Sequence, residues 1–231
     1  MIALMTISLS ALCWCLLLPG LPRSGPIPSA GSTPVNSGSV GADPRGELIK
    51  AMRAMLAARS YRSRTVSSGS SGISSSTVLE FVAPDRFHVS REAETLGRGA
   101  MKPETIVIGK DTWIKMGGAP WQRSPANLGD LITQLRNPKV VEELAQATGV
   151  EFIGPDVLDG SPTMLYQYTL SGSGGKGFKN TVKTWVGVAD GLSRRTEGDA
   201  DIVNITGKEV HTKSTTTYSA YGAEIMVEPP I

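Results

Sequence analysis

The segment STVLEFVAPDRFHVSRE, Ser76–Glu92, indicates the fold class of this chain. Apolar and polar residues alternate on both sides of Pro84-Asp85, and a period of two is typical of strands with one buried face. Pro and Asp favour turns. The segment therefore predicts a strand that ends at Ala83, a turn, and a second strand through Arg86–Val89. Antiparallel meanders are typical sources of such short strands with turn residues between them.

The same pattern extends along most of the chain. TIVIGKDTWIKM, Thr105–Met116, predicts a hairpin with its turn at Gly109-Lys110-Asp111. Asp159-Gly160 and Asp190-Gly191 stand between alternating segments, and Asp-Gly is a strong hairpin signal. We expect about ten strands in total, enough for a strongly curved sheet.

Three segments have helical spacing instead. Asp43 and Pro44 are suited to begin a helix over Arg45–Arg59. Two short one-sided helices are expected at 125–136 and 138–148, and both need a sheet to pack on. The fold class is therefore α+β, a curved antiparallel sheet covered by short helices, with an apolar cleft expected between the two layers.

The N-terminal region differs from the rest. Residues 1–20 are apolar and uncharged, which predicts a signal peptide or an N-terminal membrane anchor. Residues 21–42 are rich in Pro, Gly and Ser and predict a flexible linker, which leaves 43–231 as one folded domain. We expect export to the periplasm or envelope, with membrane tethering through the N-terminal segment as one open mode of retention.

The sequence shows no catalytic constellation. His88 and His211 both lie in strand-like alternation, and both cysteines, Cys13 and Cys15, fall in the apolar leader. No spacing is typical of a metal site, so we expect no enzyme activity, no metal and no cofactor. The net charge of +2 comes from scattered basic residues, which argues against nucleic acid as a partner.

Several separated motifs resemble the LolA/LolB-like superfamily of envelope lipoprotein carriers, which includes lipid-binding proteins of the LppX type. They are Ser60-Tyr61 after the first helix, Pro84-Asp85-Arg86-Phe87, the Ile108–Trp113 hairpin, and a Tyr-rich strand leading to Pro230. The resemblance covers about residues 44–231. It implies an incomplete, strongly curved antiparallel β-barrel with a helical lid, whose hollow holds the acyl chains of lipoproteins or other lipids.

On this basis we expect a set of large apolar side chains to line a lipid cavity, although a filled core would show the same alternation. The set is Tyr61, Leu79, Phe81, Phe87, Ile106, Ile108, Trp113, Met164, Tyr166, Tyr168 and Trp185. The lid residues would be Leu128, Leu131, Ile132, Val141 and Leu144. Arg62, Arg64 and Arg86 either meet an anionic headgroup at the rim or are solvated strand residues.

Two functions follow as hypotheses. The first is a non-catalytic carrier of acyl chains in the bacterial cell envelope, whose partners would include an inner-membrane transporter or an outer-membrane acceptor. The second is an envelope-anchored sensor or scaffold that uses the same fold to bind a protein partner.

Overall fold

The computed structural model of this chain describes residues 43–70, 72–95, 98–126, 128–129, 136, 138–171, 179–203 and 209–230. The predicted leader and linker, 1–20 and 21–42, lie outside these residues, as does most of the predicted helix 125–136. Within the described part, no helix combines the length and the apolar character that a membrane span requires.

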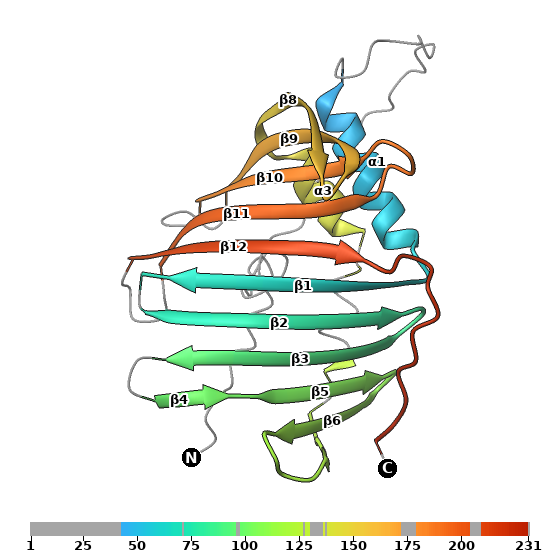
Figure 1. Ribbon diagram of the computed structural model, residues 1–231, viewed down its shortest axis with the longest axis vertical. Helices are drawn as coiled ribbons and strands as arrows, with labels where there is room; N and C mark the ends of the chain where they lie inside the picture. Colours follow the sequence, from blue (N-terminus) through green and yellow to red (C-terminus); the bar gives the residue numbers. More distant parts are fainter. Residues whose placement is uncertain are drawn as a thin grey trace, which may run out of the picture.

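The described strands form one antiparallel sheet in the order β7-β6-β5-β3-β2-β1-β12-β11-β10-β9-β8, with β4 paired to β3 (Figure 1). The strands of the first half are β1 Ser60–Gly69, β2 Ile73–Val82, β3 Arg86–Thr95, β4 Arg98–Met101, β5 Pro103–Ile108, β6 Asp111–Met116 and β7 Gln122–Arg123. Those of the second half are β8 Thr148–Leu158, β9 Ser161–Ser171, β10 Lys179–Gly187, β11 Ser193–Val203 and β12 Glu209–Ser219.

The prediction of about ten strands is close to the twelve in the sheet. The two shortest, β4 and β7, have four and two residues, and so few residues show no period in a sequence. The sheet consists of two meanders joined where β1 pairs with β12. The edge strands β7 and β8 are not paired with each other in the described part, so the sheet is open. Its predicted strong curvature stays a prediction.

Two described helices accompany the sheet. Helix α1, Pro44–Ala57, begins where predicted, because the Asp43 carboxylate accepts a hydrogen bond from the Gly46 amide at 2.9 Å. Helix α3, Lys139–Ala145, is shorter than the predicted 138–148, because Thr148 already belongs to β8. Helix α1 contacts α3, β8 and β11, so both helices lie over the second half of the sheet (Figure 1).

Candidate functional site

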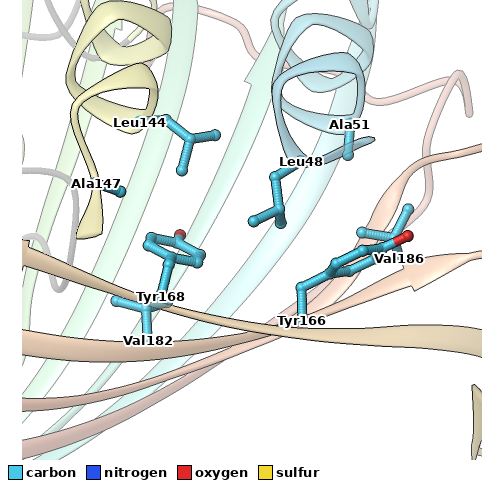
Figure 2. Close-up of a cluster of buried hydrophobic side chains, with 8 residues drawn as sticks. All are labelled: Leu48, Ala51, Leu144, Ala147, Tyr166, Tyr168, Val182 and Val186. Carbon is cyan, nitrogen blue, oxygen red and sulfur yellow. The ribbon is translucent and has the colours of Figure 1, made fainter. Parts of the chain in front are cut away.

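One face of the sheet can be followed from strand to strand by its register. Directly paired residues of antiparallel strands point to the same side. Tyr61, Phe81, Phe87 and Val107 are successive partners across β1, β2, β3 and β5. The register continues from β1 through β12, β11 and β10 to β9. It places Tyr166 and Tyr168 on the same side of the sheet. We call this side the covered face, because α1 and α3 pack on it (Figure 2).

The first apolar cluster lies where the helices meet β9 and β10. Leu48 and Ala51 come from α1, and Leu144 from α3 (Figure 2). The remaining buried members are Ala147, Tyr166, Tyr168, Val182 and Val186. Met164, Phe152 and Leu170 are partly buried against this cluster. We call it the helix cluster.

The second apolar cluster lies on the first half of the sheet and is largely aromatic. Its buried members are Tyr61, Leu79, Phe81, Phe87, Val89 and Val107. Phe81 is fully buried, with its ring centre 5.3 Å from that of Tyr61 and 4.9 Å from that of Phe87. Such tilted aromatic contacts add to the free energy gained by burial. We call this group the aromatic cluster.

A row of five threonines crosses the covered face between these clusters. The row runs through successive cross-strand partners Thr77, Thr65, Thr216, Thr196 and Thr184. All except Thr196 are buried, and the Thr65 and Thr216 hydroxyls lie 2.9 Å apart in a hydrogen bond. The next row is also short: Ser75, Ser67, Ser214 and Gly198. These two rows therefore carry only small side chains on β2, β1, β12 and β11, whereas Tyr218 of β12 lies on the same face and packs against the aromatic cluster.

Two arginines connect the helices to their surroundings. Arg136 donates to the carbonyls of Leu56 and Ala58 at the C-terminal end of α1, the second at 3.3 Å. Arg45 of α1 donates to the carbonyls of Leu144, Ala145 and Ala147 at the end of α3. Unpaired carbonyls at a helix C-terminus attract cations. The ends of α1 and α3 are therefore each held by one guanidinium.

Burial keeps the tyrosines of this face neutral. Burial raises the pKa of Tyr61, and the positive charge of Arg136 opposes this only in part. Burial also raises the pKa of Tyr168. Both phenols therefore stay protonated at neutral pH, so neither is a phenolate nucleophile.

Seven of the eleven predicted cavity residues lie on the covered face, but in two groups. Tyr61, Leu79, Phe81 and Phe87 belong to the aromatic cluster. Met164, Tyr166 and Tyr168 belong to the helix cluster or pack against it. The threonine row separates the groups, a feature that the prediction from large apolar residues missed. Contact of these seven with a lipid stays a prediction.

The other four, Ile106, Ile108, Trp113 and Trp185, lie on the opposite face. On β5 the covered face carries Val107, so its neighbours Ile106 and Ile108 point away, and Trp113 is the partner of Ile106. Trp185 pairs with Leu165, and its indole Nε1 donates to Asp156 Oδ2 at 2.7 Å. Alternation defines two faces without saying which one the helices cover, and contact of these four residues with a lipid stays a prediction.

Of the predicted lid residues, Leu128 packs against the aromatic cluster and Leu144 is buried in the helix cluster. The Leu128 amide also donates to the Thr112 hydroxyl at 3.3 Å. Val141 is half-buried in α3. Leu131 and Ile132 lie outside the described residues.

The three arginines expected either at the rim or as solvated strand residues do not lie on the covered face. Arg62 lies on the opposite face, paired with Glu80, and Arg64 shares that face by alternation. Arg86 donates to the Val227 carbonyl at 2.9 Å. Among the strand residues, Arg91, the partner of Thr77, is a cation on the covered face. Strand alternation from Phe87 and Val89 already predicts from the sequence that Arg91 lies on the same face.

Both histidines lie among charged residues away from the covered face. His88 Nδ1 is 3.1 Å from Glu80 Oε2, and His88 Nε2 is 3.6 Å from Glu104 Oε2. His211 lies close to Asp199 and Asp201. Within the described residues, no group of three potential ligands is arranged to hold a metal ion.

Comparisons with known proteins find their matches among solved structures. No protein-family model and no curated protein sequence matches the chain. The Mycobacterium tuberculosis lipoprotein LppX is 17% identical, with a TM-score of 0.56 over 80% of this chain and 98% of LppX. LprF from Mycobacterium bovis is 15% identical, with a TM-score of 0.59 over 84% of this chain and 99% of LprF.

These identities are low enough that the likeness concerns the fold. The resemblance predicted from the sequence motifs is confirmed at that level, because two structures of the predicted type match nearly over their whole length. This chain has the fold of LppX and LprF.

Proposed function

We propose that this chain is a non-catalytic carrier that binds the acyl chains of lipoproteins or other lipids on its covered face and moves them within the bacterial cell envelope. The observation that carries the proposal is the layout of that face. A row of short threonines runs from β2 in the aromatic cluster to β10 in the helix cluster, and helices cover one end of the face. Short side chains in the middle would leave room for an acyl chain that reaches from one cluster to the other.

The energetics of such a site suit a carrier. Each buried methylene contributes about 0.8 kcal/mol, so an acyl chain held between the clusters would bind strongly without any covalent step. A carrier must also release its cargo. Helix α3 has only seven residues, so it is a small unit that could open at modest cost once the contact of Arg45 with its C-terminal carbonyls breaks.

The fold supports the envelope as the location. LppX, which has this fold, is itself a lipoprotein. Tethering through the N-terminal segment, and an inner-membrane transporter or outer-membrane acceptor as partner, belong to this proposal. The alternative function, a sensor or scaffold that binds a protein partner, stays a hypothesis.

The experiment that tests the proposal is native mass spectrometry of the protein purified from bacterial membranes, together with uptake of a fluorescent fatty acid in solution. We expect a lipid mass bound to the folded protein and saturable uptake. A protein that carries no lipid, takes up no fatty acid and recovers one membrane protein in a pull-down would overturn the carrier and favour the scaffold.

A further inference from the structure

The covered face holds one buried amide group whose oxygen has no hydrogen-bond donor. Asn180 of β10 is 4% exposed, and no donor among the described residues reaches its Oδ1. Asn180 shares the covered face with Val182 and Thr184, two and four positions further along the strand. A buried acceptor without a donor costs stability, so such groups in a native protein call for a partner that these residues do not supply.

The neighbouring strand carries a glycine, Gly198, close to this oxygen. A Cβ placed on Gly198 would stand 3.2 Å from Asn180 Oδ1 and 3.0 Å from the Ser214 hydroxyl oxygen. The amide of Asn180 and the hydroxyl of Ser214 therefore converge above the one position that lacks a side chain. We call Asn180, Gly198 and Ser214 the polar notch.

The polar notch has the apolar helix cluster on one side and a row of serine hydroxyls on the other. Gly198 is the cross-strand partner of Val182, and Val182 is the partner of Tyr168, so the helix cluster begins one strand away. In the other direction, the notch continues through Ser214 to Ser67 and Ser75, whose hydroxyls lie 2.8 Å apart. An acyl chain has no donor to offer Asn180, whereas a hydroxyl or amide group on the same ligand has.

We propose that the lipid carried by this protein bears a hydrogen-bond donor, a hydroxyl or an amide N–H, on its polar end, and that this group is buried in the polar notch. The donor bonds Asn180 Oδ1, the Ser214 hydroxyl lies beside it, and the acyl chain extends over the apolar side chains of the covered face. The inference rests on the proposed lipid binding. It adds that the polar end is inserted between sheet and helices instead of staying at the rim.

The test compares two probes that share one acyl chain, a 1-monoacylglycerol with free hydroxyls and the methyl ester with none. Each displaces a bound fluorescent fatty acid from the full-length protein. We expect the monoacylglycerol to bind about tenfold more tightly, the value of one well-formed hydrogen bond. Equal affinities would refute the binding of a donor group in the polar notch and would leave the carrier proposal unaffected. Failure of both probes and of the fluorescent fatty acid would instead refute lipid binding itself.

Three variants locate the effect. Asn180→Leu keeps the size of the side chain and removes the acceptor, so the preference for the monoacylglycerol should fall to about twofold or less. Gly198→Ala places a methyl group 3.2 Å from Asn180 Oδ1 and should reduce the preference without removing the amide. Thr181→Val, next along β10 and on the opposite face, should leave it unchanged. A preference that survives both Asn180→Leu and Gly198→Ala would contradict the assignment; if Asn180→Leu fails to fold, Gly198→Ala and the wild-type comparison decide.

Discussion

The guanidinium carbon of Arg136 lies 3.7 Å from the centre of the Phe81 ring. Phe81 is the fully buried centre of the aromatic cluster, and the same guanidinium donates to carbonyls at the C-terminal end of α1. One side chain therefore joins the chain segment that precedes α3 to both the sheet and the first helix. If the helices open to admit a ligand, this contact is among those that must break.

We expect Arg136→Met to destabilise the fold by about 2–3 kcal/mol, since it removes a cation–π contact and hydrogen bonds from a charged donor. Urea unfolding measures the change. We also expect faster uptake and faster release of a fluorescent fatty acid. Arg123→Met serves as the control, because Arg123 makes an exposed ion pair with Asp111 and its loss should cost at most about 1 kcal/mol. Equal destabilisation by the two variants would contradict the role given to Arg136.

Arg45 of α1 makes the corresponding contact at the C-terminal end of α3. Its Nη2 donates to the Ala147 carbonyl at 2.9 Å, just beyond the C-terminus of α3. Arg45→Met should cost about 1–2 kcal/mol and should act locally, because those carbonyls lose a charged donor. Hydrogen exchange should speed up in α3 and change little in β1–β3. Unchanged protection of α3 would show that Arg45 does not hold that helix.

Phe81→Ala should destabilise the protein by about 3–5 kcal/mol, because it opens a cavity beneath two other rings. Val188→Ala removes a side chain that is 54% exposed, and we expect a change within about 0.5 kcal/mol. Thermal or urea unfolding of the pair measures the difference. A small effect of Phe81→Ala would mean that the aromatic cluster is loosely packed.

The opposite face gives a prediction for pH. The hydrogen bond from Lys115, at 2.9 Å, holds the pKa of Glu104 below its ordinary value of 4.5. A carboxylate whose folded pKa is lowered contributes stability above its unfolded pKa and loses that contribution as the pH falls through the folded value. Lys115→Met should therefore raise the pKa of Glu104 in an NMR titration. Its stability deficit, no more than about 1 kcal/mol at pH 7, should shrink below pH 4. A deficit that grows on acidification would contradict this sign.

How far the sequence predicts this fold depends on the kind of signal. The strands around Pro84-Asp85 and the start of α1 at Asp43 follow from local chemistry, because a turn and a helix cap are decided by adjacent residues. The face that each strand turns to the helices is decided by pairing between distant residues. Size and hydrophobicity alone therefore do not show that Trp113 and Trp185 lie on the face opposite to the helices.

The threonine row illustrates what the sequence hides. Thr65, Thr216 and Thr184 lie far apart along the chain and look like ordinary strand residues in each segment. They become neighbours only because β1 pairs with β12 and β11 joins β12 to β10. The register of those strands, not any local motif, makes the centre of the covered face small and polar.

Lipid binding on the covered face requires room above the threonine row, and fatty-acid binding to a pair of adjacent variants tests this most directly. Thr216 is buried in the row, whereas Thr217 follows it on β12 and is exposed on the opposite face. A tryptophan at position 216 would fill the room. We predict that Thr216→Trp folds with near-normal stability and loses fluorescent fatty-acid binding at least tenfold, while Thr217→Trp binds like the wild type. If the two variants bind the fatty acid equally well, or if Thr216→Trp unfolds because the space is already filled, the covered face is not a lipid site.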